Sequence, residues 1–163
     1  NFQEIKKELE NKHKFYTNAD TEVIVHAYEE YGEDCVHKLN GMFSFAIWDS
    51  NKKKLFIARD RLGVKPLFYC TVNNNLLFSS EIKSLLQFDG IKRQINYDGL
   101  YQFVTYAYTI DGQTMFQGIH ELLPGHKLIY SFLDKSLKIE KYWDLSIIES
   151  ERSEDYYLKN LTK

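Results

Sequence analysis

The stretch that decides the fold reads MFSFAIW, from Met42 to Trp48. Apolar side chains stand at odd and even positions alike, so a strand here would be buried on both faces, with Met42 and Trp48 in the core. Turn residues follow at 49–51, and the segment from Lys54 to Arg59 predicts the returning strand of a hairpin. A sheet that is apolar on both faces must lie between two layers, for example helices on one side and a second sheet on the other.

Two further strands are predicted after this hairpin. A turn at 61–66 leads into a strand at 67–72, and three asparagines at 73–75 turn the chain back into a strand at 76–78. Four short strands joined by tight turns predict one antiparallel meander.

Helices are predicted from apolar spacing and capping residues. The best marked of them has Asp20 as its N-cap, carries an apolar stripe and ends at Gly32. The others are a short helix with Phe2, Ile5 and Leu9 on one face, a piece at 33–39, a helix capped by Ser80 that runs to Leu86, and one capped by Asn96 that runs to Val104. Helices together with antiparallel strands place the chain in the α+β class.

The chain is predicted to be one domain with a short appendage. The domain covers residues 1–145, and its last element is a hairpin over 127–142 that turns near Asp134. Residues 146–163 are rich in acidic side chains and are predicted to be a linker or the start of a second domain.

Composition limits the partners of this chain. Its 163 residues are 44% apolar and 15% aromatic, which is typical of a folded domain. A net charge of −2 supplies no field that recruits nucleic acid or an anionic membrane, and no apolar run approaches the roughly 20 residues of a membrane-spanning helix. Two cysteines are too few for a disulfide scaffold. We therefore expect a cytoplasmic protein with no nucleic-acid or membrane partner.

The residues that could carry chemistry do not form a complete active site. No glycine-rich phosphate loop is visible, and the five histidines show no metal-ligand spacing with the two cysteines. Cys35 falls in a predicted helix and Cys70 in a predicted strand, where each is a small buried apolar residue rather than a nucleophile. We therefore expect no catalytic side chain and no metal site.

Two charged positions have both a structural and a functional interpretation. The Asp20 carboxylate either caps its helix or reaches the ammonium group of a substrate, and the pattern alone favours the cap. Arg59, Asp60 and Arg61 end a predicted strand. They either form structural ion pairs and turn hydrogen bonds or contact a neighbouring domain or an anionic substrate, and the structural interpretation is favoured.

Several segments, taken in order, resemble the glutamine-hydrolysing asparagine synthetases. The resemblance runs from Asn1 to about Leu145, and long motifs in the right order make it highly specific. The motifs LPGH (123–126) and YWD (142–144) favour these synthetases over other class II amidotransferases. The matching segments are NADTEVI (18–24), HAYEEYG (26–32), LNGMFSFAIWD (39–49), ARDRLGVKPLFY (58–69), FSSEIK (78–83), LPGH (123–126) and YWD (142–144).

The resemblance implies an N-terminal-nucleophile hydrolase-like fold, an α-β-β-α layered sandwich, in agreement with the doubly buried meander. It implies hydrolysis of L-glutamine to glutamate and ammonia, which passes through a tunnel to a second domain. That domain uses ATP and magnesium to adenylate aspartate, and ammonia then displaces AMP to give asparagine. Asp20 matches the aspartate that holds the amino group of glutamine, and Met42 falls where the family lines the tunnel. Arg59, Asp60 and Gly63 match a motif with a structural role near the interdomain face.

The chain also departs from the family's pattern. It begins at Asn1, which lies after the family's N-terminal cysteine nucleophile. In the family the α-amino group of this cysteine is the general base. The family residues that hold the glutamine carboxylate and the oxyanion also come before Asn1. The chain ends before the pyrophosphate loop of the synthetase domain. We therefore expect a fold that is incomplete at its N-terminus, with ATP and magnesium bound only by the missing domain. The chain alone is predicted to be inactive and, with sheet edges uncovered, poorly soluble or oligomeric.

Two alternatives stay open. One is a non-catalytic binding or docking remnant of the same fold that keeps at most the contact made by Asp20. The other is an amidotransferase that makes another amide, such as a lactam synthetase or a sugar-modifying enzyme. The resemblance implies L-glutamine as a partner of this chain, and aspartate and ATP as partners of the missing domain. The resemblance also allows a homodimer.

Overall fold

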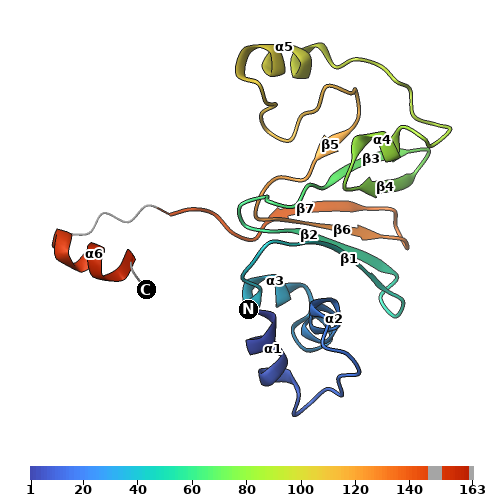
Figure 1. The fold of residues 1–163 in the computed structure, drawn as a ribbon. Coiled ribbons are helices and arrows are strands. Elements are labelled where there is room, and N and C mark those ends of the chain that lie inside the picture. Colours follow the sequence, from blue (N-terminus) through green and yellow to red (C-terminus); the bar gives the residue numbers. More distant parts are fainter. Residues whose placement is uncertain (147–151, 162–163) are drawn as a thin grey trace.

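The computed structural model describes residues 1–146 and 152–161, which form two antiparallel sheets and the helices around them (Figure 1). The described helices are α1 (Phe2–Leu9), α2 (Asp20–Tyr31), the 3-10 turn η1 (Gly32–Asp34), α3 (Cys35–Lys38), α4 (Ile82–Leu85), α5 (Tyr97–Tyr106) and α6 (Glu154–Leu161). The described strands are β1 (Ser44–Asp49), β2 (Lys54–Arg59), β3 (Phe68–Val72), β4 (Asn75–Ser79), β5 (His120–Glu121), β6 (His126–Ser131) and β7 (Leu137–Lys141).

The layers follow in the order helix, sheet, sheet, helix. Helices α1, α2 and α3 cover one face of a four-stranded sheet with the strand order β1-β2-β6-β7 (Figure 1). The three-stranded sheet β4-β3-β5 packs on the other face, and α4 packs against the second sheet. The predicted α+β class and its layered sandwich are confirmed.

Strand β2 lies at the centre of this arrangement. Its residues Phe56 and Ala58 join the core under the helices, whereas Ile57 joins the core between the two sheets. All three side chains are at most 1% exposed. This follows from the alternation of side chains along a strand, which sends neighbouring residues to opposite faces. Leu128 of β6 completes the inter-sheet core beside Ile57.

The sequence predicted double burial for residues 42–48, and that prediction is wrong. Among the described residues β1 pairs with β2 alone, so β1 is an edge strand. Its Phe45 and Ile47 pack against the helices, but Trp48 is 48% exposed, and Met42, just before the strand, is 64% exposed. The place of a strand within its sheet decides its burial, and the doubly buried strand is β2.

The single meander of four strands is wrong as well. The hairpin of β1 and β2 belongs to the first sheet and the hairpin of β3 and β4 to the second, because the loop after β2 crosses between the sheets. Turn residues predict local hairpins but do not say which hairpins share a sheet. The predicted terminal hairpin is confirmed as β6 and β7, and β6 pairs with β2.

The helix ends agree in part with the sequence. Gly32 ends α2 with φ +61°, and the Asn96 side chain accepts a first-turn N–H of α5 at 3.3 Å, both as predicted. The prediction that Ser80 caps a helix is wrong, because α4 begins at Ile82. The N–H of Glu81, just before this helix, donates to the hydroxyl of Ser79 instead. The predicted piece at 33–39 is η1 followed by α3.

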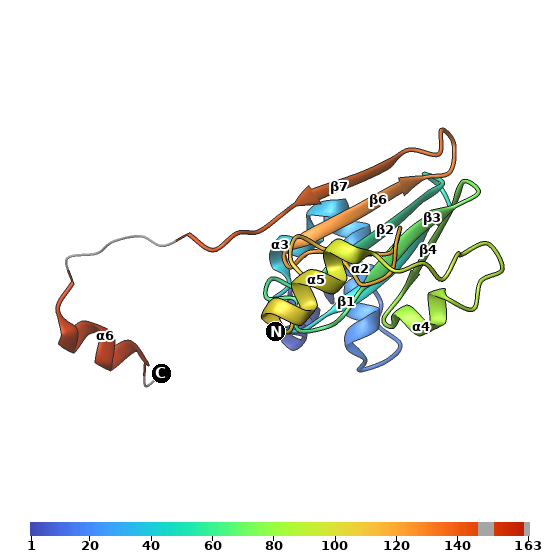
Figure 2. The same ribbon diagram turned by 90° about the horizontal axis from the view of Figure 1, so that it is seen from above.

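The C-terminal part of the described chain is the single helix α6. It lies apart from both sheets in Figure 1 and in the view from above in Figure 2. The domain boundary near residue 145 stays a prediction, since residues 147–151 lie outside the described part. No described helix combines the length and the apolar character needed to cross a membrane.

The loop that joins the two sheets is built around the buried carboxylate of Asp60, which is 1% exposed. This carboxylate accepts three main-chain N–H groups, those of Leu62 at 3.1 Å, Val64 at 3.0 Å and Lys65 at 3.0 Å. Gly63 takes φ +66° inside the loop, where an added Cβ would lie 2.7 Å from Pro124 Cγ. The carboxylate thus supplies the acceptors that a tight, buried loop requires.

Arg59 stabilises the same loop from its other side. The guanidinium group, in a side chain that is 6% exposed, donates to the carbonyls of Gly63 at 2.7 Å, Lys65 at 2.8 Å and Leu122 at 2.5 Å. It also forms an ion pair with Glu121 of β5 at 2.7 Å. The structural interpretation of Arg59 and Asp60 is therefore confirmed by their contacts.

Replacing Asp60 with alanine removes the shared acceptor of three loop N–H groups. We expect Asp60→Ala to lower the free energy of unfolding by about 2–4 kcal/mol, measured by urea unfolding. The matched control is Asp89→Ala at an exposed turn, which should change it by less than about 0.5 kcal/mol. A loss at Asp60 no larger than the control would contradict this account of the loop.

Candidate functional site

An open hollow of about 170 Å³ lies where the start of α2 meets the loop before β1. Asp20, the first residue of α2, and Met42 both line it. The structure therefore brings together the two residues that the resemblance singled out. Most of the remaining wall is apolar and comes from Phe2, Val23, Ile24, Leu39 and Phe43.

A second open hollow of about 360 Å³ shares Asp20 and Met42 with the first. Its lining includes the charged residue Lys65 and the hydroxyl residues Thr21, Ser44 and Ser80. A free amino acid carries one ammonium and one carboxylate group. Asp20 and Lys65 supply the opposite charges at the same hollow, and sequence reasoning did not single out Lys65.

The start of α2 is organised by Glu22. Its carboxylate accepts the N–H groups of Tyr16 and Thr17, each at 2.7 Å, and the Thr17 hydroxyl. The hydrogen bond from this hydroxyl is the main reason why the pKa of Glu22 lies below its usual range. Ala19, the residue just before the helix, is extended and has no side-chain acceptor. Glu22 therefore anchors the preceding segment to the helix.

The prediction that Asp20 caps α2 is wrong. Asp20 is itself the first helical residue, and its side chain is exposed. Within the described chain its carboxylate accepts one long hydrogen bond, from the Thr21 hydroxyl at 3.4 Å. A carboxylate oxygen can accept more than one hydrogen bond, so most of the capacity of Asp20 remains for a ligand.

The loop on the other side of the first hollow is held by Asn1. Its side-chain amide donates to the Lys38 carbonyl at 2.9 Å, and its side-chain oxygen accepts the Asn40 N–H at 2.8 Å. These contacts fix the loop that leads to Met42 relative to α1. The hollow is therefore a junction of α1, α2 and the approach to β1.

A family profile for the glutamine amidotransferase domain matches residues 1–143. The chain belongs to this family. Two asparagine synthetases [glutamine-hydrolyzing] of Bacillus subtilis (strain 168), numbered 3 and 2, are 42% and 40% identical to this amidotransferase domain over 159 and 153 residues. The alignments cover 96% and 91% of the chain but 25% and 20% of the relatives. The chain thus spans a quarter or less of the length of these relatives.

Two solved structures have the same fold as this amidotransferase domain. One is the allosteric regulatory enzyme of purine biosynthesis, with a TM-score of 0.59 and 22% identity over 88% of the chain and 26% of that protein. The other is glutamine phosphoribosylpyrophosphate amidotransferase from B. subtilis, with a TM-score of 0.57 and 21% identity over 86% of the chain and 26% of that protein. At these identities the likeness concerns the fold alone, and it agrees with the predicted layered sandwich.

One group of residues was missed by the sequence analysis. His13, His26 and Glu29 lie together beside α2, and their potential ligand atoms are within 4.8 Å of one another. His26 and Glu29 are three residues apart on one helix, which the sequence could have indicated. His13 lies between α1 and α2, in a segment whose path follows no periodic pattern.

The two cysteines of the amidotransferase domain are buried and free, as predicted. Cys35 is fully buried, and this burial raises the pKa of its thiol to about 12. Burial also raises the pKa of Cys70, which is 2% exposed. Since the thiolate is the reactive form, neither residue is poised to act as a nucleophile near neutral pH.

We expect both thiols to resist labelling by a disulfide reagent at pH 8 in the folded protein. Each thiol is both shielded and neutral there, so both should react only after denaturation, when their pKa values return to about 8.5. The measurement is the number of thiols labelled with and without denaturant. Rapid labelling of one thiol in the folded protein would show that the site around it is open.

Proposed function

We propose that this domain binds the ammonium group of L-glutamine through Asp20, in an enzyme that hydrolyses glutamine to glutamate and ammonia. We further propose that the whole protein is an asparagine synthetase, which uses this ammonia and ATP to convert aspartate to asparagine. The observation that carries the proposal is the Asp20 carboxylate, which is exposed at the hollow and not used as a cap. The Bacillus subtilis relatives support it by their names.

The positions of Glu22 and Asp20 support separate tasks. Glu22 forms the hydrogen bonds that anchor the segment before α2, so Asp20 is not needed for them. The Asp20 carboxylate can accept hydrogen bonds from a substrate ammonium group, and such charge-assisted hydrogen bonds are stronger than neutral ones. We assign Asp20 to substrate binding rather than to bond making.

Met42 is proposed to line the path along which ammonia leaves the hollow. It borders both hollows beside Asp20, and its neighbours Ile24 and Phe43 border them as well. Neutral ammonia is small and can pass along an apolar wall, whereas a charged ammonium ion would lose its hydration there. An apolar lining at this place therefore favours transfer of the neutral form.

The nucleophile of the proposed hydrolysis does not come from Cys35 or Cys70, because both are buried with raised pKa values. We assign it to the N-terminal cysteine that the resemblance implies for the whole protein. Inactivity of these 163 residues alone stays a prediction. ATP and magnesium are assigned to the second domain that the resemblance implies for the whole protein.

Changing Asp20 to asparagine in the whole protein tests the role of its charge. The variant keeps the size of the side chain and removes the negative charge that would meet the glutamine ammonium group. We expect kcat/KM for glutamine to fall roughly 30- to 300-fold, which corresponds to about 2–3.5 kcal/mol for a lost charged partner. The measurement is glutamate release at varied glutamine concentration.

Two controls make this result specific. Synthesis supplied directly with ammonia should remain unchanged in Asp20→Asn, because it does not use the glutamine site. Asp89→Asn, at an exposed turn, should leave both activities unchanged. Unaltered glutamine kinetics in Asp20→Asn would overturn the proposed contact, and complete absence of glutamine hydrolysis in the unmodified whole protein would favour the docking remnant.

A second candidate function is the synthesis of a different amide. The relatives do not all carry the name of an asparagine synthetase: the amidase chry2 of Gibberella zeae is 35% identical to this chain over 144 residues, with 88% of the chain and 21% of the relative aligned. The glutamine site would be the same in both cases. Product analysis with aspartate as acceptor separates them, since asparagine forms only in the first case.

The proposal also places the whole protein in the cytoplasm. Both cysteines of the chain are free and buried, as is typical of a reducing compartment. The homodimer allowed by the resemblance stays a prediction.

A further inference from the structure

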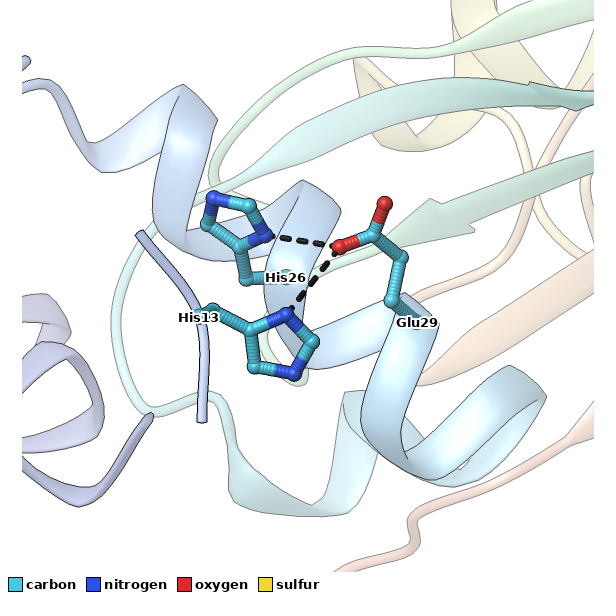
Figure 3. A group of neighbouring side chains, drawn as sticks. All are labelled: His13, His26 and Glu29. Carbon is cyan, nitrogen blue, oxygen red and sulfur yellow. Dashed lines mark hydrogen bonds and ion pairs between the residues drawn. The ribbon is translucent and has the colours of Figure 1, made fainter. Parts of the chain in front are cut away.

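A cluster of two histidines and one glutamate lies on the side of α2 that faces the segment after α1 (Figure 3). Nδ1 of His13 is 3.3 Å from Oε2 of Glu29, and Nδ1 of His26 is 2.7 Å from the same oxygen. Figure 3 shows both rings directed at this one carboxylate. The cluster is separate from the hollow at Asp20 and plays no part in the proposed glutamine chemistry.

Two of the three separations are close to those of ligands around one metal ion, and the third, between the ligand atoms of the two rings, is at most 4.8 Å. In tetrahedral zinc sites the metal lies about 2.0–2.2 Å from nitrogen and oxygen ligands, which places neighbouring ligand atoms about 3.3 Å apart. The His13 to Glu29 distance already has this value. The His26 to Glu29 distance needs to open by about half an ångström. The Glu29 side chain is 51% exposed, so it has room to make this shift.

The far nitrogen of each ring also faces a carboxylate. Nε2 of His13 is buried and lies 3.5 Å from Oε2 of Glu30, and Nε2 of His26 lies 3.9 Å from Oε1 of Glu22. A metal at Nδ1 requires the proton of a neutral imidazole to be on Nε2. Within the described part of the chain His13 Nε2 has no hydrogen-bond partner, so a proton there would find its acceptor when the gap to Glu30 closes by a few tenths of an ångström. Carboxylates in such outer positions are the usual partners of metal-bound histidines.

The outer carboxylates are themselves held in place. Lys12 pairs with Glu30, and the N–H groups of Tyr16 and Thr17 hold Glu22. The two rings are 18% and 16% exposed, and Phe15 packs edge-on against the His26 ring with the centroids 4.7 Å apart. The ring positions are thus restrained before any ion arrives.

The local charge favours a cation. Three carboxylates surround the two imidazoles, those of Glu22, Glu29 and Glu30. Of these, Glu30 forms an ion pair with Lys12. With neutral histidines the cluster carries an excess of negative charge. Nitrogen donors combined with one carboxylate suit Zn²⁺ better than Mg²⁺ or Ca²⁺, which prefer oxygen ligands.

We propose that His13 Nδ1, His26 Nδ1 and a Glu29 carboxylate oxygen bind one Zn²⁺ ion, with solvent as the fourth ligand. The ion cross-links the segment between α1 and α2 to the second and third turns of α2. Its role is structural, because it restrains the segment that contains His13 against the helix.

The test uses the protein stripped of metal with a chelator and then desalted. Titration with zinc chloride near neutral pH is expected to show one tight equivalent that the His26→Gln variant lacks. At a hundredfold excess of free zinc over Kd, the melting temperature should rise by about 5–10 °C. Addition of EDTA should reverse the rise.

Two variants and one control decide whether the ion sits at this cluster. His26→Gln and Glu29→Gln should each weaken zinc binding by about 100-fold or more, since even outer-sphere changes at metal sites cost 10- to 100-fold. Glu29 is half exposed, so its replacement leaves the fold intact, which circular dichroism checks. The control, His120→Gln, removes an exposed histidine of β5 and should bind zinc as the unmodified protein does.

Three results would overturn the proposal. One is the absence of a tight equivalent in the unmodified protein, which would make the cluster a set of histidine–carboxylate hydrogen bonds alone. Another is binding that neither His26→Gln nor Glu29→Gln weakens, which would place the ion elsewhere. The third is equal loss of binding in His120→Gln.

Discussion

The hydrogen bonds of Asp60 are the interaction on which the rest of the structure depends. Its carboxylate closes the loop between the two sheets, and its main chain extends the connection further. The Asp60 N–H donates to the Phe43 carbonyl at 2.8 Å, and its carbonyl accepts the Gly125 N–H at 2.9 Å. One buried residue therefore connects the entry to β1, the entry to β6 and the crossing to the second sheet. Phe43 also lines the hollow at Asp20, so this network sets the shape of the candidate site.

The local elements of the fold could be predicted because their causes are local. Glycine ends α2 and asparagine caps α5 through contacts within a few residues, and turn residues mark each hairpin. The grouping of hairpins into sheets could not be predicted, since it depends on the route of the loop after β2. The burial of β1 failed for a related reason. An apolar strand of the same composition can lie at the centre or at the edge of a sheet, and only its neighbours decide this.

The candidate site was predictable from the resemblance and not from the residue pattern. An aspartate before an apolar stripe is typical of an N-cap, and nothing in the spacing shows that Glu22 takes over the anchoring task. That division depends on the path of residues 16 and 17, which turn back toward the helix. The histidine cluster was hidden for the same physical reason. His13 comes close to His26 only because an irregular segment folds against α2.

The position of β6 between β2 and β7 has a consequence for how the chain folds during synthesis. The register pairs Lys54 with Ser131, so the first sheet remains unfinished until the last third of the domain has been made. Until then, α1 to α3 and the first hairpin can assemble, but Ile57 lacks its partner Leu128 and presents an apolar face. Non-local pairing of this kind slows folding. The face of β2 that carries Ile57 therefore stays open to solvent until the second sheet covers it.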